Sequence, residues 1–144
     1  MNNTKSNYTT LSDTIKTFEK DNTKYIEPET RFNYYNTMGN FLDKFYLADK
    51  QTKYMMLKDE IPKTTTLPAG ERARLAGMVH HFQRKYNLPK ITWIDKDDYI
   101  SKVWYWGLKG KPRTTEYGMV RLLEADIEFI LRRVIAKRND FTRV

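Results

Sequence analysis

Apolar side chains recur at intervals of three and four residues along most of this chain. The clearest stripe lies between Pro68 and Tyr86 and consists of Leu75, Met78, Val79, Phe82 and Tyr86. Residues spaced in this way lie on one face of an α-helix, so the spacing predicts an amphipathic helix over residues 68–86. Pro68 suits its first turn, and Pro89 follows its expected end.

Three helices are predicted before this one. A short helix is expected over residues 12–20, with Ile15 and Phe18 turned inward. A longer helix is expected to begin near Pro28, because a proline between two acids suits a first helical turn. A third is expected over residues 49–60. The long helix carries an aromatic-rich stripe that we interpret as core: Phe32, Tyr35, Phe41, Leu42, Phe45 and Tyr46.

The pattern is less regular after Pro89. Residues 90–94 are β-branched and aromatic, and they predict either a short strand or an extended connector. Asp95 is expected to cap a helix over residues 96–106 that Gly107 closes. A last helix is expected over residues 114–138, with acids early and cations late, as the helix dipole favours. Together these elements predict an all-α fold, a small bundle of about five to six helices with at most one short β-like segment near residues 90–94.

Charge divides the chain into two parts. The 26 Lys+Arg exceed the 18 Asp+Glu, for a formal net charge of +8. Residues 1–66 hold ten basic and nine acidic residues, whereas residues 67–144 hold sixteen and nine. We therefore expect a near-neutral N-terminal helical part with a polar arm (1–62) and a basic C-terminal helical part (63–144), packed as one compact domain. A one-sided positive charge predicts a polyanionic or acidic partner.

Several classes of protein are excluded or disfavoured by composition. The chain has no cysteine, which excludes disulfides, thiolate metal sites and cysteine nucleophiles. No apolar run reaches the roughly twenty residues needed to span a bilayer, so no membrane partner is expected. The N-terminal residues are polar and lack the apolar core of a signal peptide. We expect a cytoplasmic protein, located in the host cytoplasm or the virion if it is phage-encoded.

The stretch from Lys102 to Arg113 carries the strongest functional signal. It combines four cations, three adjacent aromatic residues and two glycines with no acidic residue. Cations neutralise phosphates, aromatic rings stack on bases, and glycine lets a backbone approach a ligand. We expect Trp106, and alternatively Trp104, to stack on a base. The phosphate contacts are assigned to Lys102, Lys109, Lys111 and Arg113.

A second basic face lies on the predicted helix 68–86. Its members are Arg74, Gly77, His81, Arg84 and Lys85. Such a face can lie along a phosphate backbone or enter a groove, so Arg74, His81, Arg84 and Lys85 are further candidate nucleic-acid contacts. The alternative is a solvated helix surface with no ligand.

No arrangement of an active site, metal site or cofactor loop is complete. His80 and His81 are adjacent, so on a helix they point about 100° apart and cannot chelate one ion together. The acids Asp95, Asp97 and Asp98 lack the spacing of a calcium loop. Gly110-Lys111 is followed by proline, which does not fit a phosphate-binding loop of nucleotide hydrolases. We therefore expect no catalytic residue, no metal and no cofactor.

The sequence leaves two hypotheses of function. The first is a non-enzymatic protein that binds DNA or RNA through its basic C-terminal half. The second is a protein–protein assembly subunit, such as a phage head–tail component or an inhibitor of a host complex, with an acidic protein or a second copy as partner. Its interface would use Tyr34, Tyr54, Met55 and Met56. Size and composition are similar to those of small proteins of bacteriophages and mobile elements.

Overall fold

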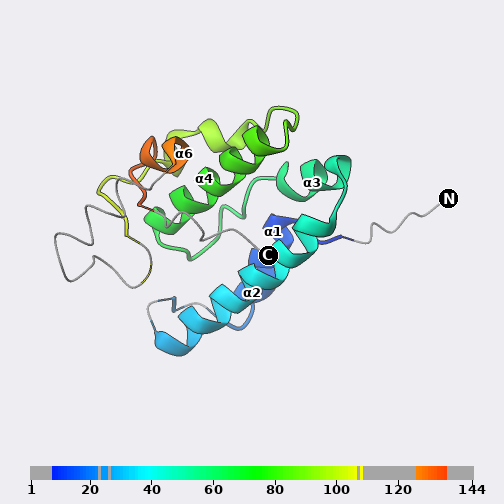
Figure 1. The fold of residues 1–144 in the computed structure, drawn as a ribbon. Coiled ribbons are helices and arrows are strands. Elements are labelled where there is room, and N and C mark those ends of the chain that lie inside the picture. The colour runs from blue at the N-terminus through cyan, green and yellow to red at the C-terminus, as the bar shows by residue number, and fades with distance from the viewer. Residues whose placement is uncertain (1–7, 23, 26, 107, 109–125, 136–144) are drawn as a thin grey trace.

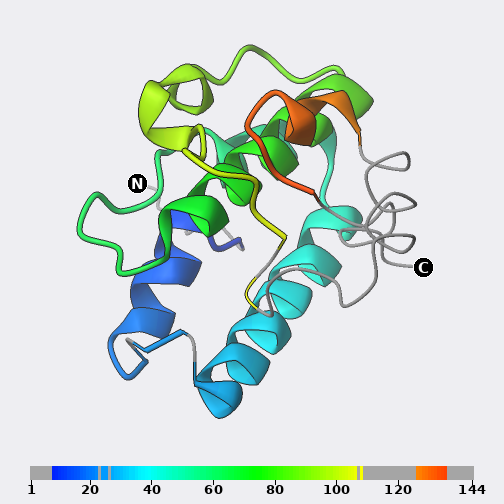
Figure 2. The same cartoon turned by 90° about the vertical axis from the view of Figure 1, so that its left-hand side faces the viewer.

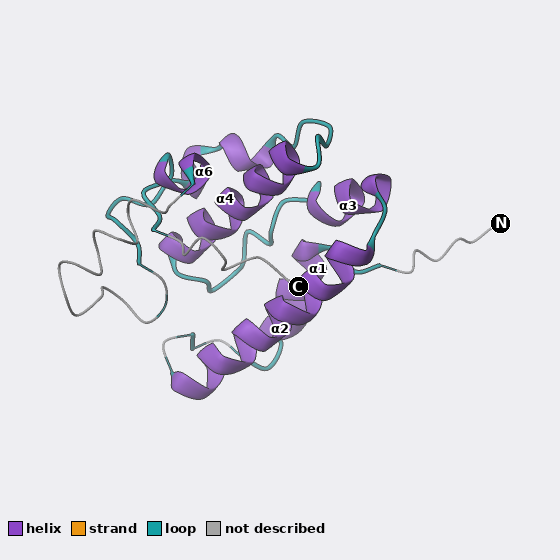
Figure 3. Cartoon of the chain, viewed as in Figure 1, coloured by secondary structure: helices purple, strands orange, loops and turns teal. Residues whose placement is uncertain are grey.

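The computed structural model describes residues 8–22, 24–25, 27–106, 108 and 126–135. Within these ranges the chain forms five α-helices and two 3-10 helices and contains no strand (Figure 3). The fold is all-α, as the hydrophobic pattern predicted. The α-helices are α1 (Leu11–Glu19), α2 (Pro28–Leu47), α3 (Lys50–Leu57), α4 (Ala69–Lys85) and α6 (Ile127–Ile130), and the 3-10 helices are η1 (Trp93–Asp95) and η2 (Asp97–Tyr99).

Helix α4 lies between the other elements (Figure 1). Helices α1, α2 and α3 pack against one another on one side, whereas η1, η2 and α6 contact α4 on the other (Figure 2). The rings of Phe45 and Phe82 meet at 4.5 Å between centroids and join α2 to α4. No helix in the described ranges is long and apolar enough to cross a bilayer.

Two glycines let other elements approach α4 from its second side. A Cβ on Gly77 would lie 2.6 Å from the ring of Phe129, and a Cβ on Gly70 would lie 2.2 Å from the ring of Tyr105. Most residues of α4 are therefore buried, and the expectation of one apolar and one solvated face is wrong. Glycine on the polar side of α4 lets neighbouring side chains pack there, so this helix is buried on both sides.

Helices α1 and α2 follow the prediction with local corrections. Helix α1 starts at Leu11 rather than Ser12, because the hydroxyl of Thr10 accepts a hydrogen bond from the Asp13 backbone N–H at 3.0 Å. In α2 the aromatic stripe is rotated from the expected one, since Tyr34 is buried whereas Phe32 is 65% exposed. The buried side chains of α2 are Tyr34, Met38, Phe41, Leu42 and Phe45.

The segment between α3 and α4 is tied to α1. Helix α3 is capped by Asp49, whose carboxylate accepts from the Thr52 backbone N–H at 2.7 Å. Beyond it, Glu19 accepts hydrogen bonds from the Thr65 hydroxyl at 2.6 Å and the Thr66 backbone N–H at 3.2 Å. Residues 63–67 thus contact the N-terminal helix directly.

The expected helix over residues 96–106 is wrong. Instead of capping a helix, Asp95 ends η1, and after η2 the chain continues as an irregular segment. Its backbone pairs with the segment after α6: the N–H groups of Ser101 and Tyr105 donate to the carbonyls of Arg132 and Arg133 at 3.0 and 2.9 Å. This pairing satisfies the backbone polar groups that a helix would otherwise satisfy. No strand forms at residues 90–94, which make a connector that leads into η1.

The expected helix over residues 114–138 is also wrong where the structure describes it. Asp126 is extended, α6 has only four residues, and Arg133 adopts a left-handed φ of 58°. Burial of Phe129 against Gly77 and of Val134 in the core explains the short helix, because one continuous helix cannot place both there. Residues 114–125 and 136–138 lie outside the described residues.

Candidate nucleic-acid interface

The predicted contact residues fall into three groups in the structure. Lys109, Lys111 and Arg113 lie outside the described residues. The helix residues Arg74, His81, Arg84 and Lys85 belong to α4. Lys102 and Trp106 belong to the irregular segment that pairs with residues 132–135. The described candidates therefore lie on two elements, α4 and the irregular segment that packs on its N-terminal end through Tyr105.

Arg74 is part of a buried ion network. Its guanidinium donates to a carboxylate oxygen of Glu71 at 2.9 Å, and Glu71 is 0% exposed. The same carboxylate accepts from the hydroxyls of Tyr34 at 2.7 Å and Tyr105 at 2.9 Å. Burial, together with the charge of Glu71, raises the pKa of Tyr34 and of Tyr105 above the usual range for tyrosine. Arg74 thus balances a carboxylate inside the fold.

His81 and Arg84 fasten α6 to α4. His81 Nδ1 lies 3.0 Å from one oxygen of Glu128, and the Arg84 guanidinium donates to the other at 2.8 Å. Burial acts to raise the pKa of Glu128, but a backbone N–H, His81 and Arg84 together hold it below its ordinary value. The carboxylate of Asp126 lies 3.7 Å from His81 Nδ1. A phosphate would have to compete with these carboxylates for His81 and Arg84.

Lys85 is the exposed cation of α4 that carries no carboxylate partner among the described residues. Its ammonium lies 5.5 Å from the ring of Tyr46 and 5.4 Å from that of Tyr86. Lys53 of α3 contacts the same aromatic residues. Its ammonium lies 4.9 Å from the Tyr86 ring and donates to the carbonyls of Tyr46 and Ala48. Burial lowers the pKa of Lys53. Two cations thus share aromatic faces where α2, α3 and α4 meet.

The irregular segment and the segment paired with it present an exposed tryptophan and two exposed cations. Trp104 is 49% exposed and its neighbour Val103 is 71% exposed, whereas Trp106 is half-buried. Lys102 is exposed on the same segment. Arg133 is exposed as well, and its guanidinium donates to the Ser101 carbonyl at 3.1 Å, directly beside Lys102. We call Lys102, Val103, Trp104 and Arg133 the Trp104 surface.

Sequence reasoning missed part of this surface. Arg133 was assigned to a long helix, and no periodic pattern connects it with Lys102, which lies about thirty residues earlier. Only the backbone pairing of the two segments brings them together. Trp104 and Trp106 were both considered for stacking, and exposure favours Trp104.

The two histidines face different partners. His80 Nδ1 lies 3.0 Å from the Arg132 guanidinium, whereas His81 faces Glu128. Burial, and then the charge of Arg132, lowers the pKa of His80. In the described part of the chain, no three histidine or carboxylate side chains gather closely enough to hold a metal ion.

The described residues define a small all-α protein. Comparison of the chain with protein-family models, with curated proteins and with solved structures finds no match. Its function therefore has to be argued from its own residues.

Proposed function

We propose that this protein binds nucleic acid without catalysis and that the Trp104 surface is its contact. The observation that carries the proposal is the half-exposed Trp104 side chain on the same segment as Lys102, which the Arg133 guanidinium joins through the Ser101 carbonyl. Neither cation has a carboxylate partner among the described residues. An exposed ring can stack on a base while neighbouring cations neutralise phosphates. Lys85, at the C-terminal end of α4 beside Tyr46 and Tyr86, is a separate proposed phosphate contact.

Three of the α4 candidates are left out of the proposed contact. We assign Arg74 to the interior and His81 and Arg84 to holding α6, because Arg74 contacts Glu71 and the other two contact Glu128, both of which are buried carboxylates. Lys109, Lys111 and Arg113 follow the Trp104 surface in sequence and remain proposed phosphate contacts. The cytoplasm, or a virion for a phage-encoded protein, is the proposed location.

The first experiment measures fluorescence anisotropy of labelled single- and double-stranded DNA and RNA over a salt series. We expect micromolar or tighter binding at low salt and a steep linear fall of log K with log salt. Preference for single strands would support stacking by Trp104. Absence of binding to all four probes at low salt would overturn the proposal.

Paired variants locate the contact. Replacing Lys102 and Arg133 together by alanine should reduce the magnitude of the salt slope by about 2, since each phosphate contact contributes nearly one unit. Lys16→Ala with Lys50→Ala removes the same charge from exposed positions of the N-terminal part and serves as the control. An equal change in slope for both pairs would mean that binding depends on net charge and not on this surface.

Removal of the ring tests stacking separately. Trp104→Ala should weaken single-strand binding by about 1–3 kcal/mol and leave the salt slope unchanged, because a base–aromatic contact releases no counterion. Leu47→Ala is a matched control, since Leu47 is an exposed apolar residue on α2. Unchanged affinity of Trp104→Ala would assign binding to charge alone.

A second candidate function is an assembly subunit. Ile127, Leu131, Val103 and Trp104 are exposed large apolar side chains near the paired segments, and exposed apolar surface is typical of protein interfaces. The residues first assigned to such an interface fit less well, because Tyr34 and Met56 are core residues of this chain. Light scattering that gives an oligomeric mass, combined with no nucleic-acid binding, would favour this function.

A further inference from the structure

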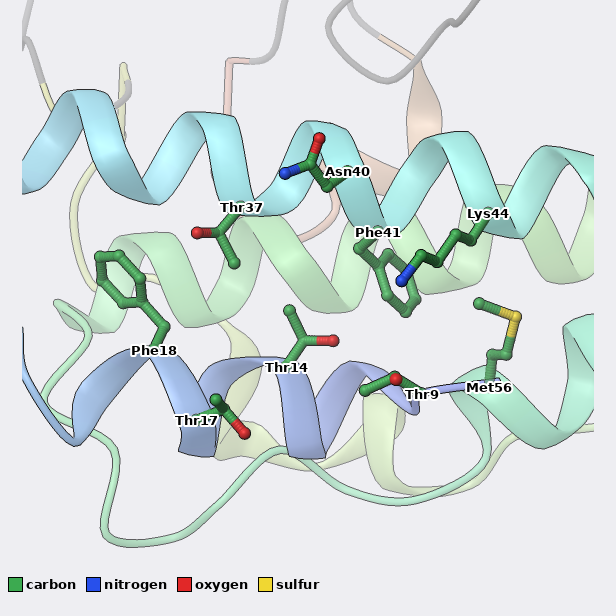
Figure 4. Close-up of a pocket in the computed structure, with 9 residues that line it drawn as sticks. All are labelled: Thr9, Thr14, Thr17, Phe18, Thr37, Asn40, Phe41, Lys44 and Met56. Atoms are coloured by element: carbon green, nitrogen blue, oxygen red, sulfur yellow. The ribbon is translucent and has the colours of Figure 1, made fainter. Parts of the chain in front are cut away.

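An open pocket lies between helices α1 and α2 and involves none of the cationic residues described above. Its volume is about 350 Å³, and Met56 of α3 also lines it. Figure 4 shows Thr14 near the middle of the space between the helices, with Phe18 and Phe41 on either side and Lys44 one turn beyond Phe41 on α2. Side chains from three separate elements therefore contribute to one pocket.

The floor of the pocket is apolar. Phe18, Phe41 and Met56 are buried side chains that nevertheless line the space. Two aromatic rings and a thioether offer a surface against which a flat apolar group can pack. A pocket of a few hundred Å³ with a mostly apolar lining and a few polar groups is typical of small-molecule sites.

The rim of the pocket is polar, and Lys44 is the one charged residue among its described lining residues. The other polar lining residues are threonines and one asparagine, and none of the residues that line the pocket is acidic. The Thr14 hydroxyl donates to the Thr10 carbonyl at 2.9 Å, so its oxygen can only accept a hydrogen bond from a ligand. Thr37 lies opposite on α2. Lys44 is exposed and has no carboxylate partner within the described ranges. The rim thus offers one positive charge and neutral hydrogen-bonding groups.

We propose that this pocket binds a small molecule with a flat apolar body and a single anionic group. The body lies on Phe18, Phe41 and Met56, and the anion lies at Lys44. An uncharged ligand of the same shape loses the interaction with Lys44, and a dianion leaves one charge without a cationic partner. The inference rests on this pocket alone and does not depend on binding of nucleic acid.

The test uses 2-naphthoate as the probe and 2-naphthamide as its uncharged counterpart. Titration of the isotope-labelled protein by NMR should give saturable shifts for amides of α1 and α2 around Thr14 and Thr37. A Kd of roughly 0.1–1 mM is expected from the affinity that small ligands gain per non-hydrogen atom. Shifts that do not saturate, or that spread over the whole protein, would overturn the proposal.

Two variants make the test specific. Lys44→Met should weaken naphthoate about fivefold and leave naphthamide unchanged, a loss at the upper end for an exposed ion pair. Lys50→Met removes an exposed lysine outside the pocket and should change neither affinity. Thr37→Trp should abolish binding of both probes by filling the space, with circular dichroism as the check of folding. If Thr37→Trp does not fold, the Lys44→Met comparison decides alone: equal loss for both probes, or loss for neither, rejects the proposed role of Lys44.

Discussion

Glu71 illustrates what a single residue contributes to this fold. It is 0% exposed, and the groups that donate to its carboxylate come from α2, from α4 and from the segment after η2. A buried carboxylate is costly unless hydrogen bonds and a cation compensate it, and here Tyr34, Tyr105 and Arg74 do so. The residue therefore makes the position of three distant parts of the chain interdependent.

Replacement of Glu71 tests this dependence. Glu71→Gln should lower the free energy of unfolding by about 3 kcal/mol, because the buried Arg74 guanidinium loses its carboxylate. Urea unfolding at neutral pH measures the loss. Glu27→Gln is the control, since Glu27 is exposed and its change should stay within about 0.5 kcal/mol. A loss below about 1 kcal/mol for Glu71→Gln would show that Arg74 is stabilised by its other surroundings.

At the scale of elements, α6 is held by side chains rather than by its own length. It has four residues, too few to be stable in isolation. Its attachment to α4 comes from Phe129 on Gly77 and from Glu128 between His81 and Arg84. After the C-terminal end of α6, the buried Arg132 guanidinium donates to the carbonyls of Glu128 and Ile94 at 2.9 Å each.

The ionisation of Glu128 makes this attachment pH-dependent. Its pKa is lowered in the folded protein, so the stabilisation is present above the unfolded value of about 4.3 and is lost as pH falls below it. Glu128→Gln should cost about 2 kcal/mol at pH 7 and approach the wild-type stability near pH 3. Urea unfolding at both pH values measures the difference, with the exposed Asp21→Asn as control. A difference that stays constant between pH 7 and pH 3 would contradict a charged role.

At the scale of the whole molecule, the near-neutral and basic parts share contacts along their length. The indole N–H of Trp93 donates to the Leu57 carbonyl at 3.0 Å, and the Tyr99 hydroxyl donates to Glu60 at 2.6 Å. Phe45 on Phe82 and Tyr34 on Glu71 add contacts between α2 and α4. One compact domain stays a prediction, and these links give it a physical basis.

Cooperativity of unfolding tests that prediction. All three tryptophans lie in the basic part, so their fluorescence reports that part, whereas far-ultraviolet circular dichroism reports the helices of both parts. We expect the two urea transitions to coincide, because shared core contacts make the parts unfold together. Separate midpoints would show two independently folding units.

Local patterns were enough to predict the α-helices up to Lys85. In each of them, apolar residues recur at helical spacing, and capping or proline signals lie close to the ends. Formation of these helices therefore depends mainly on residues that are near one another in sequence. The sequence did not predict which face of α2 is buried, because aromatic residues occupy several sides of this helix. Only packing against the other helices buries Tyr34 and leaves Phe32 exposed. The exposure of Lys85 also agrees with its place on the polar side of α4.

The sequence by itself determined the all-α class, the helices of the first 85 residues and the absence of cysteine chemistry, because these follow from composition and local periodicity. Tertiary structure decided which cations are exposed without a carboxylate partner among the described residues. Arg74 is buried because Glu71 needs a compensating charge, and Arg84 is paired because α6 brings Glu128 to it. Arg133 joins Lys102 because two distant segments pair through their backbones. Contacts between residues far apart in the chain have no periodic signature, so only the folded structure reveals them.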